Sequence, residues 1–167
     1  MVMDDICIGE VTYLRENGGL LFPDVEETLK ELSINYDLFI VSNCQDGYAD
    51  AFMDYHGLRK YFKDYETNGK TKLSKTENIK LILDRNNLKE AVYIGDTTGG
   101  EISARLTGIS FIHAAYCFGK VISPDLVVNS LKDLVKQASK AFKKYNKETP
   151  ASLQTGVSFW CDYHFYT

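Results

Sequence analysis

The sequence predicts an α/β fold in which a doubly wound parallel sheet is covered by helices on both faces. Short apolar runs rich in β-branched residues alternate with amphipathic helical segments. The connections between these runs are long enough for right-handed crossovers between parallel strands. A length of 167 residues corresponds to one domain, and 44% hydrophobic with 25% charged residues is ordinary for a globular chain.

The first half of the chain predicts one buried strand between two helices. Asp24 is placed to cap a helix with apolar residues at i, i+4 and i+7. The run 38–41 (Leu-Phe-Ile-Val) is typical of a buried parallel strand. A second helix follows and ends near Gly57. We expect residues 61–72 to be irregular, with a turn at Asn68 and Gly69.

The second half predicts three more strands separated by helices. Ser74 or Thr76 can cap a third helix, a fourth ends at Gly108, and Asn129 can cap a long last helix. The basic outer face of that last helix is interpreted as a solvated surface. The strands are expected at residues 91–95, 109–112 and 125–128.

Charge and hydropathy exclude several classes of protein. Lys and Arg total 19 against 23 Asp and Glu, and this net charge of −4 disfavours nucleic acid as the main partner. No apolar stretch approaches the ~20 residues that span a bilayer. The first residues lack the positive segment of a secretory signal, so we expect a cytoplasmic chain with no membrane partner. The four widely spaced cysteines are expected to be reduced thiols.

Polar side chains follow two of the predicted strands at the points where those strands end. Ser42 and Asn43 follow the first strand, Asp96 follows the second, and Lys75 begins the helix between them. Ligands bind at this edge of a parallel sheet. A hydroxyl, an ammonium and a carboxylate together suit a phosphate ester bound with Mg²⁺. Each of these residues also has a purely structural interpretation: Ser42 as the start of a turn, Lys75 as a surface lysine and Asp96 as a helix cap.

These motifs resemble those of the haloacid dehalogenase-like hydrolases. Residues 41–43 (Val-Ser-Asn) are similar to the second family motif, 73–75 (Leu-Ser-Lys) to the third, and 93–97 (Tyr-Ile-Gly-Asp-Thr) to the fourth. Residues 20–27 resemble the segment that re-enters the core from the cap in the phosphoglycolate-phosphatase-like branch.

The resemblance covers about residues 20–134 and implies a Rossmann-like core with the cap domain essentially absent. It divides the chain into a cap remnant or N-terminal extension (1–19), the α/β core (20–147) and an aromatic C-terminal tail (148–167).

The resemblance also implies Mg²⁺-dependent hydrolysis of a small phosphorylated metabolite through an aspartyl-phosphate. Ser42 would hydrogen-bond the phosphoryl group beside Asn43, which would bind substrate. Lys75 would steady the nucleophile and the phosphate. Asp96 would hold Mg²⁺, and Glu101 stands where some members carry a second acidic ligand.

One family motif is missing ahead of Ser42: the apolar strand followed by Asp-x-Asp-Gly-Thr that supplies the nucleophile. Asp4 and Asp5 do not replace it, because no strand of sufficient length precedes them. In this fold the missing strand is central, and an empty slot would leave two rows of backbone groups unpaired. Another segment of the chain must fill the slot, the two flanking strands must pair directly, or a second chain must supply a strand.

The C-terminal tail is one candidate for that slot, since residues 157–167 are apolar and aromatic with strong strand propensity. Asp162 would then stand as a permuted nucleophile, although His164 occupies the place of the second acid. We favour instead a tail that packs as an edge strand or pairs with a second copy to form a homo-oligomer.

Two functions therefore stay open for the chain. One is a phosphatase, impaired if the nucleophile is missing, and the other is an inactive domain that binds phosphate or metal or serves in assembly. A dinucleotide-binding oxidoreductase is disfavoured, because Gly95, Gly99 and Gly100 do not reproduce the spacing of G-x-G-x-x-G.

Overall fold

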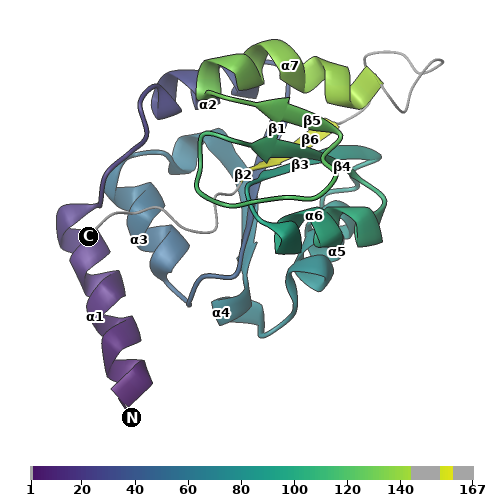
Figure 1. Cartoon of the computed structure of the whole chain (residues 1–167). Helices are drawn as coiled ribbons and strands as arrows, with labels where there is room; N and C mark the ends of the chain where they lie inside the picture. The colour runs from purple at the N-terminus through teal and green to yellow at the C-terminus, as the bar shows by residue number, and fades with distance from the viewer. Residues whose placement is uncertain (1, 144–154, 160–167) are drawn as a thin grey trace.

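Six parallel strands form one sheet in the computed structural model, which describes residues 2–143 and 155–159 (Figure 1). The strand order is β2-β1-β6-β3-β4-β5, and every neighbouring pair is parallel. This confirms the predicted fold class. The strands are β1 (Asp37–Ser42), β2 (Phe62–Thr67), β3 (Glu90–Gly95), β4 (Ser110–Ala114), β5 (Leu126–Val128) and β6 (Thr155–Phe159).

Seven α-helices and one 3-10 turn connect these strands within the described residues. None of the helices is both long and apolar enough to cross a membrane. They are α1 (Val2–Asn17), α2 (Val25–Ser33), α3 (Tyr48–Tyr55), α4 (Asn68–Thr71), α5 (Lys75–Arg85), α6 (Thr98–Thr107) and α7 (Leu131–Lys143), with the 3-10 turn η1 at Arg59–Tyr61.

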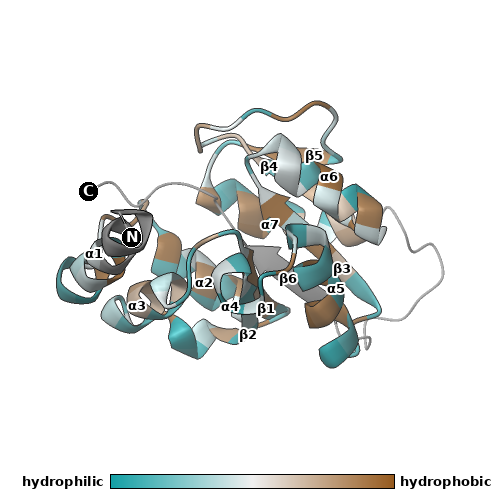
Figure 2. Cartoon of the chain, turned by 90° about the horizontal axis from the view of Figure 1, so that it is seen from below, coloured by the Kyte–Doolittle hydropathy of each residue, from teal (hydrophilic) through white to brown (hydrophobic). Residues whose placement is uncertain are grey.

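Alternation along the strands divides the apolar core between the two faces of the sheet. Leu38 and Ile40 of β1 pack with residues of α2, α3 and α7, whereas Phe39 and Val41 pack with residues of α5 and α6. The helices follow the same division, because the buried residues of α2, α3 and α7 belong to one cluster and those of α5 and α6 to the other; Figure 2 shows brown apolar residues interspersed with teal polar ones along these helices. The result is a three-layer α/β/α arrangement with the sheet buried on both faces.

Residues 62–67 form the edge strand β2, where the sequence analysis expected irregular structure. β2 pairs with β1 in parallel, from Leu38 opposite Phe62 to Ser42 opposite Thr67. Its charged residues hid the strand pattern, but Arg85 of α5 binds two of them: its guanidinium lies 2.8 Å from an oxygen of Asp64 and 2.7 Å from an oxygen of Glu66. Charge on an edge strand also discourages pairing with other chains.

The N-terminal helix caps agree with the sequence at one predicted position and differ at two. Ser74 caps α5 in a capping box with Glu77, as predicted. Asp24 has a left-handed backbone with φ of 65° and no side-chain cap bond, and its carboxylate pairs with Lys132 at 3.2 Å. α7 is capped by Ser130, whose Oγ accepts the N–H of Asp133 at 3.1 Å, rather than by Asn129.

The central position of the sheet is filled by β6, the last described segment of the chain. Val157 lies opposite both Leu38 of β1 and Val92 of β3, and Phe159 lies opposite both Ile40 and Ile94. The expectation that the tail would pack at an edge was therefore wrong. β1 and β3 each offer a row of unpaired backbone groups at this gap, and an inserted strand satisfies both rows, whereas an edge strand satisfies only one.

Replacing Val157 by Pro tests this placement. Proline removes a backbone N–H and clashes in the middle of a sheet, so we expect a loss of about 3 kcal/mol or more in the free energy of unfolding. Urea denaturation measures it. Val157→Thr keeps both the N–H and the β-branched shape and should cost far less. Equal stability of Val157→Pro and the parent would contradict a central β6.

Candidate functional site

Ser42 and Asp96 reach the same edge of the sheet, at the carboxyl ends of β1 and β3. Ile40 of β1 and Ile94 of β3 both pair with Phe159 of β6. Ser42 and Asp96 each follow one of these residues by two positions, so they lie at the same level on either side of β6. Both are buried, with 1% of Ser42 and 3% of Asp96 exposed. Two polar side chains enclosed at the end of a parallel sheet mark the place where such sheets bind ligands.

The Ser42 hydroxyl is fixed by its own loop. Its Oγ accepts the backbone N–H of Cys44 at 3.0 Å. That bond uses an oxygen lone pair and leaves the O–H hydrogen for an anionic ligand. Asn43, between these two residues, is exposed at the mouth of the site. The two predicted residues of this loop thus differ in exposure: Ser42 is buried and Asn43 is exposed.

Lys75 is buried, which sets it apart from a surface lysine. It is the first residue of α5, and only 6% of it is exposed. Its Nζ lies 5.8 Å from the ring centroid of Tyr93, a cation–π contact between α5 and β3. Tyr93 in turn stacks on Phe111 with centroids 6.1 Å apart. The ammonium is thereby held beside β3, the strand that carries Asp96.

The Asp96 carboxylate has one oxygen engaged and one unsatisfied. Oδ2 accepts the backbone N–H of Gly119 at 3.0 Å, while the buried Oδ1 has no hydrogen-bond partner among the described residues. A buried, unsatisfied carboxylate oxygen is costly and suits a hard cation such as Mg²⁺. Within residues 2–143 and 155–159, no three His, Cys, Asp or Glu side chains converge to hold a metal.

Glu101 is buried, but both of its oxygens bind the chain. Oε2 accepts the N–H of Ile122 and Oε1 that of Ser123, each at 2.8 Å. This carboxylate therefore anchors the loop between β4 and β5 to α6. Its predicted role as a metal ligand is not shown by this arrangement, and it stays a prediction.

Three residues of the β4–β5 region, absent from the sequence-based set of site residues, adjoin the site. The partly buried Tyr116 lies near Asp96: burial raises the pKa of its hydroxyl, and the charge of Asp96 raises it further. Gly119 approaches so closely that an added Cβ would lie 2.2 Å from the Asp96 carbonyl oxygen. His113, at the end of β4, has its Nε2 buried with no partner among the described residues. A glycine in a loop that follows a strand was the signal available for Gly119.

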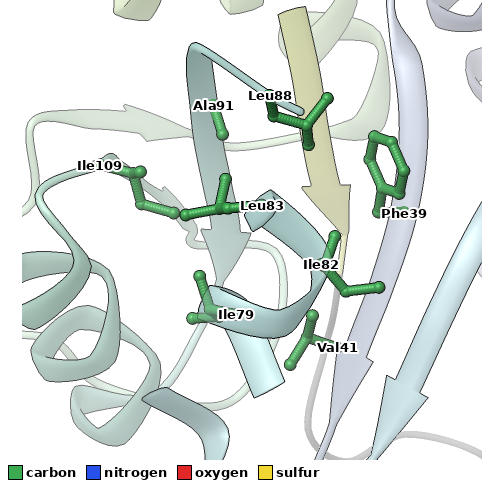
Figure 3. Close-up of a pocket in the computed structure, with 8 residues that line it drawn as sticks. All are labelled: Phe39, Val41, Ile79, Ile82, Leu83, Leu88, Ala91 and Ile109. Carbon is green, nitrogen blue, oxygen red and sulfur yellow. The ribbon is translucent and has the colours of Figure 1, made fainter. Parts of the chain in front are cut away.

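An apolar cavity between α5 and the sheet does not belong to this site. Its volume is about 10 Å³, at the lower limit for one water molecule, and a wholly apolar lining favours an empty space (Figure 3). It is a small gap in packing. The lining residues are Phe39, Val41, Ile79, Ile82, Leu83, Leu88, Ala91 and Ile109.

Asp162 and His164 lie outside the described residues, so the sequence-based interpretation of both remains a prediction.

Substituting Gly119 by Ala tests the close approach of the loop to Asp96. The new methyl group would meet a backbone oxygen, which cannot rotate away, so we expect about 1–3 kcal/mol of destabilisation in thermal or urea unfolding. Gly99→Ala is the matched control, because the nearest atom to its Cβ is 4.0 Å away. Equal behaviour of the two variants would rule out the contact.

Comparison with known proteins places this geometry in a family. The model of the haloacid dehalogenase-like hydrolases matches residues 14–114, more than half of the chain. The phosphoglycolate phosphatase of Vibrio parahaemolyticus is 27% identical over 125 residues, which are 69% of this chain and 55% of that protein. The chain thus spans about half the length of this curated relative.

Solved structures agree with the fold. A haloacid dehalogenase-like hydrolase from Streptococcus pneumoniae aligns with a TM-score of 0.66 at 24% identity, covering 71% of this chain and 60% of that one. A hydrolase from Bacillus subtilis, solved with magnesium bound, aligns with a TM-score of 0.64 at 19% identity, covering 75% and 59%. These structures share the fold, and the matched family model shows that the chain belongs to the haloacid dehalogenase-like hydrolases.

Proposed function

We propose that the chain binds a small phosphate ester together with Mg²⁺ at the edge formed by Ser42, Lys75 and Asp96, and hydrolyses it. The observation that supports the proposal is the position of β6. A parallel strand between β1 and β3 runs toward the same edge as Ser42 and Asp96. The chain therefore has a strand in the place from which a nucleophile could be presented.

Each residue of the site would have a distinct task. The Ser42 hydroxyl donates to a phosphoryl oxygen, and the exposed Asn43 contacts the substrate from the mouth of the site. The Lys75 ammonium neutralises charge on the phosphoryl group. Asp96 would hold Mg²⁺ through its unsatisfied Oδ1. When bound, Mg²⁺ would stabilise negative charge on the phosphoryl oxygens.

We propose Asp162 as the nucleophile, because it follows β6 by three residues in the sequence. Its carboxylate oxygen would attack phosphorus, and the bond from phosphorus to the ester oxygen would break, with that oxygen taking a proton from solvent water as the alcohol leaves. Water would then attack phosphorus in the aspartyl-phosphate, which restores the carboxylate and releases inorganic phosphate.

One observation favours an inactive binding domain as the second candidate. Each oxygen of Glu101 accepts a backbone N–H and so anchors a loop, and no cluster of three metal-binding side chains is found among the described residues. Ser42, Lys75 and Asp96 could still bind phosphate with a weakly held cation. Such a domain would serve in binding or assembly without turnover.

Hydrolysis of p-nitrophenyl phosphate and phosphoglycolate with Mg²⁺ separates the two candidates. We expect turnover by the parent and a loss of at least ~100-fold in Asp96→Asn and Asp162→Asn, because each substitution removes a reacting or charge-stabilising oxygen. Asp84→Asn, on the exposed side of α5, is the matched control and should stay active. No turnover by the folded parent would favour the binding domain, and full activity of Asp162→Asn would exclude that nucleophile.

Mg²⁺ titration of the same proteins by calorimetry extends the experiment to Glu101. Asp96→Asn should weaken Mg²⁺ binding by at least ~10-fold. Because Glu101 anchors two amides, Glu101→Gln should lower the unfolding temperature. Its Mg²⁺ affinity should stay close to that of the parent. Equal losses of affinity in both variants would make Glu101 a metal ligand.

A further inference from the structure

A chain of hydrogen bonds joins the loop after β1 to the helix α4. The backbone N–H of Cys44 donates to Oγ of Ser42 at 3.0 Å, and the carbonyl oxygen of Cys44 accepts the N–H of Gly69 at 2.9 Å. Gly69 belongs to α4, the four-residue helix that follows β2. The loop that holds the Ser42 hydroxyl therefore rests directly on α4.

The contact at Gly69 leaves no room for a side chain. A Cβ added there would lie 2.0 Å from the backbone nitrogen of Asp46 and 2.3 Å from the carbonyl carbon of Gln45. Both are backbone atoms, which cannot rotate away as the end of a side chain can. Glycine is the residue that permits so close an approach of two backbones. The contact sets how near α4 lies to the Ser42 loop.

The end of α4 is fastened to the start of α5 by a network of polar side chains. Oγ1 of Thr71 accepts the N–H of Leu73 at 3.1 Å and can donate to Oδ1 of Asn78 at 2.8 Å or to the carbonyl oxygen of Thr67 at 3.0 Å. The carbonyl oxygen of Leu73 accepts Nδ2–H of Asn68 at 2.9 Å and Nδ2–H of Asn78 at 3.4 Å. Side chains thus hold both backbone groups of Leu73.

This network is not needed as a helix cap, because α5 already has one. Ser74 and Glu77 form a capping box at its first turn. Asn78 is nonetheless fully buried, with 0% exposed, and burial of an amide is costly unless its hydrogen bonds are made. A satisfied buried polar network favours a single arrangement of the chain. Here it fixes the path by which the chain passes Leu73 and reaches Lys75.

The start and the end of α4 therefore connect to two different groups of the candidate site. The start holds the loop of Ser42, and the end holds the chain just before Lys75. We propose that Thr71 and Asn78 are positioning residues, which act through α4 to fix the distance between that hydroxyl and that ammonium. The inference rests on the proposed binding of a phosphoryl group by Ser42 and Lys75, which is sensitive to small displacements of either group.

Replacing Thr71 by Val tests the coupling without any ligand. Valine keeps the β-branched shape but removes the hydroxyl, so the N–H of Leu73 loses its acceptor. We expect the Leu73 amide of the full chain to exchange with solvent at least ~5-fold faster, read by NMR. The Cys44 amide, which is held on Ser42 beyond α4, should exchange at least ~3-fold faster.

Thr71→Ser is the matched control, because serine keeps the hydroxyl and should leave both exchange rates close to those of the parent. Amides of β3 should be unchanged in both variants, which separates a local effect from general destabilisation. Gly69→Ala provides an independent route, since its Cβ would move α4 away from the Ser42 loop and should also speed exchange at Cys44. Faster exchange at Leu73 in Thr71→Val with no change at Cys44 would overturn the proposal.

Binding of inorganic phosphate in the presence of Mg²⁺ measures the consequence for the site. Calorimetry should show phosphate bound at least ~10-fold more weakly by Thr71→Val than by the parent, and within ~2-fold by Thr71→Ser. A purely structural role would lower the unfolding temperature and leave the affinity of the folded protein unchanged. Equal affinity of Thr71→Val and the parent would therefore contradict the proposal. Absence of binding by the parent would instead count against the proposed function, and the exchange rates at Leu73 and Cys44 would still decide the coupling through α4.

Discussion

A strand inside a parallel sheet must find hydrogen-bond partners on both of its edges, and the core of this protein depends on that requirement. β1 with β2 forms one part of the sheet, and β3 with β4 and β5 forms the other. Among the described strands only β6 joins these two parts, since it pairs with β1 on one side and β3 on the other. The helices pack on faces that exist only when the sheet is continuous.

The geometry of the candidate site depends on the same three neighbouring strands, β1, β6 and β3. Ser42 ends the strand on one side of β6, and Asp96 follows the strand on the other side. Their separation is therefore set by the width of one inserted strand. The neighbouring loop adds a second constraint, because the Gly119 N–H donates to one oxygen of Asp96, while the other is buried with no hydrogen-bond partner in the described part of the chain. Burial of Lys75 against Tyr93 supplies the positive charge nearby.

The parts of this fold that local sequence patterns determine could be predicted. The buried strands β1, β3 and β4 are continuous apolar runs, and the capping box of α5 is a local motif. β2 was missed because its charged residues obscure the strand pattern, and their stabilising contacts with Arg85 are distant in sequence. The slot that β6 occupies depends on pairing with β1 and β3, which propensity alone does not specify. Likewise, the two contacts of Glu101 could not be predicted, because the backbone N–H groups that it accepts lie in a loop distant in the sequence.

Hydrogen exchange of the backbone amides in residues 156–159 measures the central claim most directly. Amides of a strand paired on both sides exchange only through large openings of the sheet. We therefore predict protection in β6 equal to that in β1 and β3, read residue by residue by NMR in the full chain. Exchange of these amides at the rate of an unstructured peptide, with β1 and β3 still protected, would contradict the account.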